Sequence, residues 1–317
     1  METAILNGTD IEVSRICAGC WQAAGWSTSD DERFVRTVRH ALDSGINFLD
    51  TAVGYGAGHS EELVGKAIEG RREEVVVASK LRPGRDAPDD LREELEGSLQ
   101  RLGTDYIDLY QQHWPSKNVP LADTVGELVR LKEEGKIRAV GVSNYMEPEW
   151  EEIDDPSVID CLQPNYSLLW RSIEPNVLPL CRRNDIGIIT YSTLCQGILA
   201  GKFESLDEVP EDSRSSNRRL TEEEFPQVLE VIEVLREVAE SHAKTMAQTA
   251  IRWVLEQEGV TCAIVGASRP EQVDDNLGAL GWTLDDEACE RLSEVSRPLS
   301  ADLEPHDTLW GWHPREN

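Results

Sequence analysis

Short stretches at the ends of predicted β-strands carry four side chains that can act together on a carbonyl group. Asp50 and Tyr55 lie in LDTAVGYG, Lys80 in VVVASK, and His113 in YQQHWP. A carboxylate, a phenol, an ammonium and an imidazole are the groups needed to protonate a carbonyl oxygen while a hydride reaches its carbon. Because a barrel gathers functional side chains at its strand ends, these stretches predict one reductive site.

Each of the four side chains has an expected role in that chemistry. A tyrosine has an ordinary pKa of about 10, so a catalytic phenol needs a nearby cation, and Lys80 is the candidate. Asp50 would pair with Lys80 and hold it in place, while His113 would donate a hydrogen bond to the substrate carbonyl. No side chain supplies a hydride, so a nicotinamide cofactor is implied. Each residue also has a non-catalytic interpretation: Tyr55 as a surface aromatic, Lys80 as a solvated lysine, and HWP as a simple turn. The placement of these stretches after different strands favours one shared site.

The elements that must position these side chains alternate along the chain. Helix-period segments separate the strand-like runs, and a hairpin with an Asn7-Gly8 turn precedes them. This order predicts a (β/α)₈ TIM barrel with an N-terminal hairpin and one or two extra helices. The strand-like runs are 14–19, 46–50, 74–80, 106–112, 136–142, 157–163, 187–192 and 261–266.

Helix ends and long connections complete the predicted organisation. Ser29 and Glu32 are spaced as a capping box, and we expect helix C-terminal glycines at 45, 103, 135 and 187. One domain, 1–317, is predicted. The polar stretch 203–225 after the seventh strand is either a mobile surface insertion or a lid over a cofactor. An extra helix is expected near 285–295, and the tail 297–317 is expected near the substrate site.

Composition excludes several classes of protein. Sixty acidic residues stand against 31 basic ones, giving a net charge of −29. Nucleic-acid binding is not expected, because it needs a basic face. Such acidity is typical of a protein in concentrated salt, so we expect a halophilic, cytoplasmic protein.

The start of the chain has no signal-peptide pattern and no segment is apolar enough for a membrane span. Cys17 and Cys20 form a lone CxxC, for which buried thiols are expected rather than a metal site.

With these motifs in place, the chain resembles the aldo-keto reductase family over nearly its whole length. The resemblance rests on LDTAVGYGAGHSEELVGKAI, VVVASKL and LGTDYIDLYQQHWP. It implies that Tyr55 is the general acid, that His113 orients the carbonyl, and that Lys80 with Asp50 tunes the phenol. It also implies that the N-terminal hairpin caps the bottom of the barrel.

The second half of the chain resembles the cofactor-binding stretches of that family. Contacts with the nicotinamide carboxamide are implied by GVSNY and LQPNYS. An aromatic stack on the nicotinamide and contacts with the pyrophosphate are implied by TYSTLCQGILAGK. An adenosine-phosphate site is implied by IVGASRPEQVDDNLGAL. The implied residues are Ser143, Asn144 and Gln163; Tyr191, Ser192, Leu194 and Gln196; and Gly266, Ala267, Ser268, Arg269, Gln272, Asp275 and Asn276.

Two departures from the family pattern bear on the cofactor. Thr193 stands where many members have proline, and Gln272 stands where some have an arginine that grips the 2′-phosphate. Ser268 and Arg269 still offer a hydroxyl and a guanidinium suited to that phosphate. We therefore expect NADP, with NAD as an alternative.

The substrate is less well defined by the sequence. Trp21 and Trp114, with Trp26, Trp310 and Trp312 as further candidates, would wall an apolar pocket for an aldehyde or ketone of modest size, including a sugar. Two other functions stay open. A barrel aldolase would use Lys80 as a Schiff-base nucleophile, and a non-catalytic, NADP-binding regulatory subunit would resemble the β subunits of potassium channels. The oligomeric state is left open.

Overall fold

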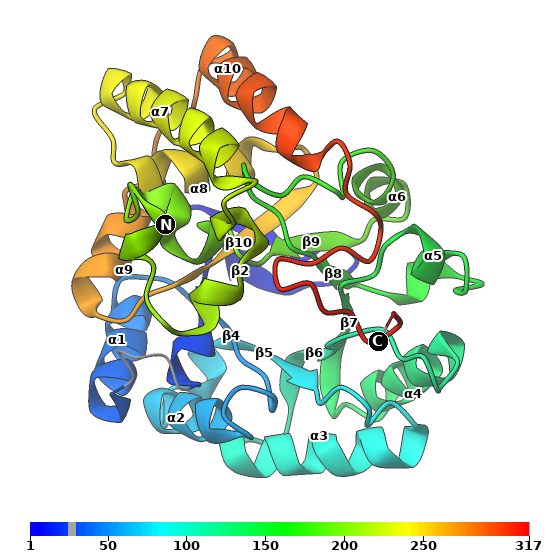
Figure 1. The fold of residues 1–317 in the computed structure, drawn as a ribbon. Helices are drawn as coiled ribbons and strands as arrows, with labels where there is room; N and C mark the ends of the chain where they lie inside the picture. The colour runs from blue at the N-terminus through cyan, green and yellow to red at the C-terminus, as the bar shows by residue number, and fades with distance from the viewer. Residues whose placement is uncertain (25–29, 317) are drawn as a thin grey trace.

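Parallel strands form a closed barrel at the centre of the molecule (Figure 1). In the computed structural model, which describes residues 1–24 and 30–316, eight strands close in the order β3 to β10, with β10 pairing back to β3. The predicted (β/α)₈ barrel is therefore confirmed. The strands are β3 Ile16–Gly19, β4 Phe48–Asp50, β5 Val76–Leu81, β6 Ile107–Gln112, β7 Ile137–Ser143, β8 Cys161–Gln163, β9 Gly187–Thr190 and β10 Val260–Gly266.

Side chains alternate between two hydrophobic cores along each strand. On β5, Val76 and Ala78 belong to a small cluster inside the barrel, whereas Val77 and Leu81 pack against the surrounding helices. The alternation follows from the two-residue period of a strand. It means that every second residue near a strand end points into the mouth of the barrel.

The N-terminal hairpin closes the other end of the barrel. Strand β1, Thr3–Ile5, pairs antiparallel with β2, Glu12–Ser14. Leu6, Ile11 and Val13 are buried in the same inner cluster as Phe48 of β4. The predicted hairpin is thus present, and its apolar residues fill the bottom of the barrel interior.

Helices surround the barrel. They are α1 Asp31–Asp43, α2 His59–Ile68, α3 Pro88–Leu102, α4 Leu121–Glu133, α5 Glu147–Trp150, α6 Val177–Arg183, α7 Phe225–Ser241, α8 Met246–Glu256, α9 Pro270–Leu277 and α10 Asp286–Ser296. Two helices, α7 and α8, follow β9, and α10 comes after the last strand-helix unit. Helices α7 and α10 pack against each other. Among the residues that the structure describes, none of the helices is long and apolar enough to cross a membrane.

Most of the predicted helix-ending glycines have the expected backbone. Gly45, Gly103 and Gly135 have positive φ at the ends of α1, α3 and α4. The prediction for Gly187 was wrong, because α6 ends at Arg183 and Gly187 already begins β9. The turn between them uses Asp185, whose φ is 55°.

The start of α1 differs from the predicted capping box. Asp30 is the N-cap, and its side chain accepts a hydrogen bond from the Arg33 backbone N–H. Ser29, the predicted cap, lies outside the described residues. The first turn of α1 therefore receives its carboxylate cap from the neighbouring position.

Candidate active site

The mouth of the barrel holds three of the four predicted catalytic residues, two on inward-facing strand positions and His113 directly after a strand. Asp50 lies two residues after Phe48 of the inner cluster, and Lys80 lies two residues after Ala78. His113 follows β6 four residues after Leu109, which shares that cluster. The alternation that builds the core thus aims all three side chains at one place. Tyr55 comes from the loop after β4.

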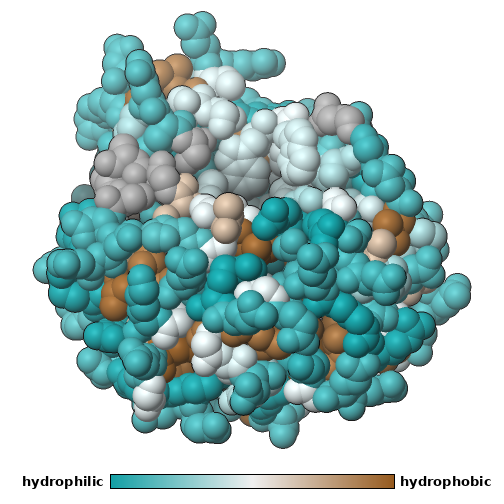
Figure 2. Space-filling model, turned by 90° about the horizontal axis from the view of Figure 1, so that it is seen from below, coloured by the Kyte–Doolittle hydropathy of each residue, from teal (hydrophilic) through white to brown (hydrophobic). Residues whose placement is uncertain are grey.

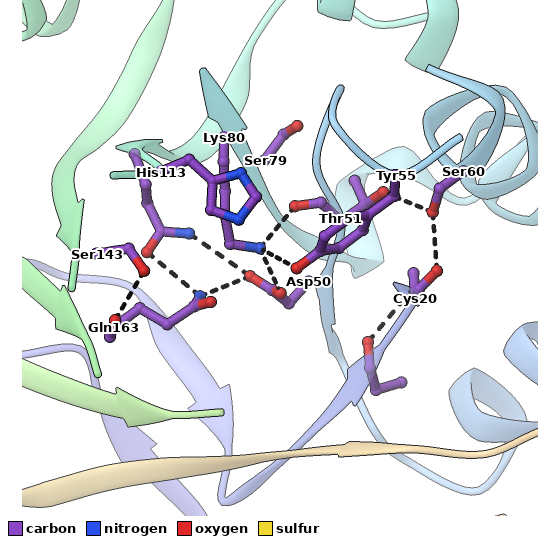
Figure 3. Close-up of polar contacts among 12 residues, drawn as sticks. Cys20, Asp50, Thr51, Tyr55, Ser60, Ser79, Lys80, His113, Ser143 and Gln163 are labelled. Carbon is purple, nitrogen blue, oxygen red and sulfur yellow. Dashed lines mark hydrogen bonds and ion pairs between the residues drawn. The ribbon is translucent and has the colours of Figure 1, made fainter. Parts of the chain in front are cut away.

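The ammonium of Lys80 is the centre of the site (Figure 3). Its Nζ donates to Asp50 Oδ1 at 2.6 Å, to the Thr51 carbonyl oxygen at 2.9 Å and to the Tyr55 hydroxyl at 3.2 Å. Lys80 is fully buried, and Asp50 is only 2% exposed. The structure therefore brings together the phenol, ammonium and carboxylate that the sequence predicted as one unit.

Burial and pairing act in opposite directions on these groups. Burial alone would lower the pKa of Lys80, but the charge of Asp50 and the contact with Tyr55 raise it above its ordinary value. Burial raises the pKa of Tyr55, and the positive charge of Lys80 opposes that rise. Lys80 therefore lowers the pKa of Tyr55 relative to burial alone, although desolvation is the larger effect. Tyr55 holds its proton firmly at neutral pH.

His113 lies beside the phenol as a neutral imidazole. Its ring is perpendicular to that of Tyr55, with centroids 5.8 Å apart. Burial and the nearby charge of Lys80 hold the pKa of His113 well below its usual range. Its Nδ1 is buried and has no hydrogen-bond partner among the described residues. A neutral imidazole carries one N–H, which is able to donate to a carbonyl oxygen.

The three residues predicted to hold a carboxamide are joined to this group by hydrogen bonds. Gln163 Nε2 donates to Asp50 Oδ2 at 2.8 Å, and Ser143 Oγ donates to the Gln163 carbonyl oxygen at 2.8 Å. Asn144 Nδ2 donates to Ser143 Oγ, and Tyr191 donates from its hydroxyl to Asn144 Oδ1 at 2.7 Å. One continuous polar network therefore runs from Tyr191 to Asp50, and through Lys80 to Tyr55.

The backbone after β9 is contorted where the sequence predicted a phosphate contact. Ser192, Cys195 and Gln196 all have positive φ, between 44° and 56°. Leu194 caps the short 3₁₀ helix that follows, η4 Cys195–Ala200. Gln196 Oε1 accepts from Asn217, but its buried Nε2 has no partner among the described residues. Strained backbone and an unpaired buried donor together are typical of a segment built around a ligand.

The end of β10 is a tight turn into α9. A Cβ atom on Gly266 would lie 1.6 Å from Gln22 Nε2, so a larger residue there would have to displace the Gln22 side chain. The backbone N–H of Ser268 donates to Gln272 Oε1 at 2.8 Å, and its hydroxyl lies 3.0 Å from the same oxygen. Arg269 stands immediately before α9, with its guanidinium 3.7 Å from Glu271. Ser268, Arg269 and Gln272 are thus grouped as predicted.

Three other residues of this segment face the body of the protein. Asp275 accepts a hydrogen bond from Gln248 of α8 at 2.8 Å. Ala267 and Asn276 line a cavity of about 20 Å³ between the barrel and α1. These contacts hold α9 against its neighbours.

The sequence reasoning missed a group of cations beside this segment. Partial burial and the charges of Arg214 and Arg269 lower the pKa of Lys202. Arg214 belongs to the polar stretch 203–225 and donates to Asp212 at 2.8 Å. Three cations that crowd one another stand out in a protein of net charge −29. The GK at 201–202 and the first arginine of SRSSNRRL, Arg214, were the available signals.

Tryptophans flank the phenol and the imidazole. The ring of Trp21 lies 6.4 Å from that of Tyr55, and the ring of Trp114 lies 6.5 Å from that of His113. Both predicted substrate-binding residues therefore border the site. Trp26 lies outside the described residues.

The C-terminal tail adds two further tryptophans. Trp310 lies 5.8 Å from Trp21 and is parallel to Tyr191 at 6.4 Å, while Trp312 lies 5.3 Å from Trp114. In Figure 1 this tail, in red, runs across the barrel. The tail thus contacts aromatic rings on both sides of the barrel mouth.

Comparison with known proteins places this site in a family context. The model of the Aldo/keto reductase family matches residues 15–297. The chain is 38% identical over 303 residues to aldo-keto reductase YhdN of Bacillus subtilis (strain 168), covering 90% of this chain and 91% of that protein. It is 36% identical over 325 residues to the NADH-specific methylglyoxal reductase of Escherichia coli (strain K12), covering 94% and 99%.

Solved structures share the fold. The glycerol dehydrogenase AKR11B4 from Gluconobacter oxydans superimposes with a TM-score of 0.85 at 34% identity, covering 96% of this chain and 98% of that one. An aldo/keto reductase from Klebsiella pneumoniae in complex with NADP and acetate gives a TM-score of 0.78 at 29% identity, covering 93% and 96%.

Proposed function

The chain belongs to the aldo/keto reductase family, and we propose that it reduces a small aldehyde or ketone, sugars included, with Tyr55 as proton donor. The observation that carries this proposal is the contact of the Tyr55 hydroxyl with Lys80 Nζ at 3.2 Å, while Lys80 is paired with Asp50 at 2.6 Å. A protonated phenol beside a buried cation is suited to give up its proton only when a basic oxygen forms next to it.

The residues act in a defined order on the substrate carbonyl. His113 donates its N–H to the carbonyl oxygen and fixes the orientation of the substrate. Tyr55 transfers its proton to that oxygen as negative charge develops, and Lys80 stabilises the resulting phenolate. Asp50 keeps Lys80 charged and in place. When bound, a nicotinamide cofactor supplies the hydride to the carbonyl carbon.

We propose that the cofactor is NADP, with NAD as the alternative. Ser143, Asn144 and Gln163 would hold the carboxamide, Tyr191 would stack on the ring, and Ser192, Leu194 and Gln196 would hold the pyrophosphate. Fit is supported by the unpaired buried Nε2 of Gln196 and the positive-φ backbone beside it. The adenosine end would use Gly266, Ala267, Ser268, Arg269, Gln272, Asp275 and Asn276, and the cations of Lys202 and Arg214 suit phosphate.

Two segments are proposed to border the bound ligands. The stretch 203–225, which carries Arg214, would cover the cofactor, and the tail 297–317 would border the substrate through Trp310 and Trp312. Trp21 and Trp114 would form the opposite wall. Aromatic walls favour an uncharged carbonyl substrate. Two relatives are named for methylglyoxal reduction and glycerol dehydrogenation, and methylglyoxal and glycerol are both small, uncharged molecules.

The decisive experiment replaces the phenol. We expect Tyr55→Phe to lower kcat for reduction at least about a hundredfold, because general acid catalysis contributes that much. Nucleotide affinity, followed by quenching of tryptophan fluorescence, should stay unchanged. Tyr106→Phe is the matched control, since Tyr106 packs under Arg72 just before β6 begins. A fully active Tyr55→Phe protein would remove the proposed mechanism.

The alternative functions have separate tests. A Schiff-base aldolase needs a neutral lysine, whereas pairing with Asp50 raises the pKa of Lys80. Borohydride treatment with substrate would trap such a base on Lys80, and we expect no trapping. A regulatory subunit that only binds nucleotide would show negligible nucleotide oxidation with a panel of aldehydes, and we expect turnover.

A further inference from the structure

A polar side chain without an assigned role lies directly beneath the catalytic groups. Gln111 occupies an inward-facing position of β6, between Leu109 of the inner cluster and His113. It is level with Lys80 on β5 and Gly141 on β7, and it is fully buried. Other inward positions lower in the barrel are apolar, so a carboxamide at this level needs polar partners.

Those partners are Asp50 and Gln163. Gln111 Nε2 lies 3.5 Å from Asp50 Oδ2, and Gln111 Oε1 accepts from Gln163 Nε2 at 3.4 Å. Gln163 Nε2 also donates to Asp50 Oδ2 at 2.8 Å. The two carboxamides and the carboxylate therefore form a closed triangle, in which Gln163 is held both by a strong bond to Asp50 and by an acceptor on Gln111.

The neighbouring strand makes room for this arrangement. A Cβ atom on Gly141 would lie 2.4 Å from Gln111 Cγ. Gly141 is not among the described glycines with positive φ, so its backbone conformation does not require glycine. The absence of a side chain on β7 is instead explained by the space that the Gln111 side chain occupies.

We propose that Gln111 is a positioning residue that fixes the carboxamide of Gln163 against Asp50, so that Gln163 presents its carbonyl oxygen to the cofactor. Both N–H groups of Gln163 are used within the triangle, which leaves Oε1 as its remaining polar atom. A rotated carboxamide would instead bring that oxygen against the carboxylate of Asp50. Gln163 is thereby set to accept a hydrogen bond from an amide N–H.

This role links nucleotide binding to the proton-donating group, and it rests on the proposed function. Asp50 shares one oxygen with the carboxamides and the other with Lys80, which contacts Tyr55. Any change that moves Gln111 therefore reaches both the nucleotide and the phenol. If Gln111 only filled space, a substitution that keeps the shape of its side chain would change neither nucleotide binding nor the environment of Tyr55.

The first test uses a titratable isostere. Gln111→Glu would place a second carboxyl group about 3.5 Å from Asp50 Oδ2. Because like charges at this distance disfavour ionisation, the new carboxyl group should titrate well above its ordinary pKa of about 4.3. We expect affinity for oxidised nucleotide, measured by tryptophan fluorescence, to be near wild type in acid and to weaken about tenfold as the pH rises through that ionisation. A pH profile identical to that of the wild type would overturn the proposal.

The second test keeps the length of the side chain and removes its hydrogen bonds. We expect Gln111→Met to weaken nucleotide binding about three- to tenfold, as the loss of one or two modest hydrogen bonds implies. Its effect should be non-additive with that of Gln163→Met, because the two side chains act through one contact. Strict additivity, or unchanged affinity in Gln111→Met, would overturn the proposal even if the Glu variant failed to fold.

A matched control stands next in the sequence. Gln112 is equally buried but points to the outside of the barrel, where it bonds with Asp86 and Tyr145. Gln112→Met should lower thermal stability and leave nucleotide affinity and its pH dependence unchanged. These nucleotide measurements test the role of Gln111 separately from the proposed mechanism. A fully active Tyr55→Phe protein would refute the mechanism but would not change the nucleotide affinities of the Gln111 variants.

Discussion

The ion pair at the barrel mouth holds two charges away from water. Lys80 is fully buried, and its Nζ lies 2.6 Å from the nearly buried carboxylate of Asp50. Such a pair gains little net stability, because both charges lose their hydration. Removing one member, however, leaves an uncompensated buried charge. The arrangement therefore fits the proposed chemistry at Tyr55 better than a role in stability.

This residue-scale reasoning predicts the effect of breaking the pair. Lys80→Met should lower the free energy of unfolding by about 3–5 kcal/mol, measured by urea denaturation, because Asp50 is left buried and charged. Adding Asp50→Asn should restore most of the loss. Lys66→Met, at an exposed position of α2, should change stability little. Equal stabilities of the Lys80 and Lys66 variants would contradict the prediction.

At the scale of elements, the C-terminal tail is fastened on two sides of the barrel. On one side Arg218 pairs with Asp307 at 2.9 Å. On the other, the fully buried Glu149 of α5 accepts from His306 and Arg315, both at 2.9 Å. Between these anchors lie the tryptophans that reach the site. The tail is thus ordered by ion pairs rather than by secondary structure.

His313 makes the docking of this tail sensitive to acid. Burial, together with the charges of His306 and Arg315, lowers the pKa of His313 to about 4. Its ring is also stacked on His306, with centroids 4.2 Å apart, and His306 in turn contacts Glu149 and Glu316. An unfolded histidine has a pKa of about 6.5, so between these values only the unfolded chain binds a proton. Stability is therefore full above the unfolded pKa and is lost as the pH falls towards the folded one.

The expected loss can be measured directly. From about pH 7.5 to about pH 5, the His313 contribution should cost up to about 2 kcal/mol of unfolding free energy in urea. His313→Phe keeps an aromatic ring without a titrating group, and it should remove this part of the pH dependence. If the free energy of unfolding depends on pH in the same way in both proteins, the predicted contribution of His313 is contradicted.

At the scale of the whole molecule, acidic charge dominates. The face seen in Figure 2 is covered mostly by hydrophilic residues, with hydrophobic ones scattered between them. Arginines bridge several exposed carboxylates, as Arg71 does with Asp43 and Glu74. Such exposed pairs contribute little each, and they leave a net charge of −29 whose self-repulsion favours expansion.

We therefore propose that the protein is adapted to concentrated salt. The melting temperature and activity should rise as KCl increases from about 0.1 M to the molar range, because screening shortens the range of repulsion from about 10 Å to about 3 Å. NaCl at equal ionic strength should act similarly if screening is the cause. An optimum at low salt for both properties would contradict the proposal.

The sequence by itself determined the barrel and singled out the residues of the proposed reactive set. The two-residue period of the strands and the helical segments between them are local patterns, and Asp50, Lys80 and His113 each lie at a strand end that can be recognised from its neighbours. The error at Gly187 arose because a glycine between a helix and a strand satisfies the pattern of either.

Only the tertiary structure decided how these residues influence one another. The raised pKa of Tyr55, the triangle of Asp50, Gln111 and Gln163, and the cations around Lys202 all depend on distances between different strands or loops. Desolvation and charge interactions vary with burial and separation in space, which local sequence patterns do not encode. The candidate residues could therefore be predicted from the sequence, whereas their pKa shifts and mutual contacts depend on how the closed barrel places them.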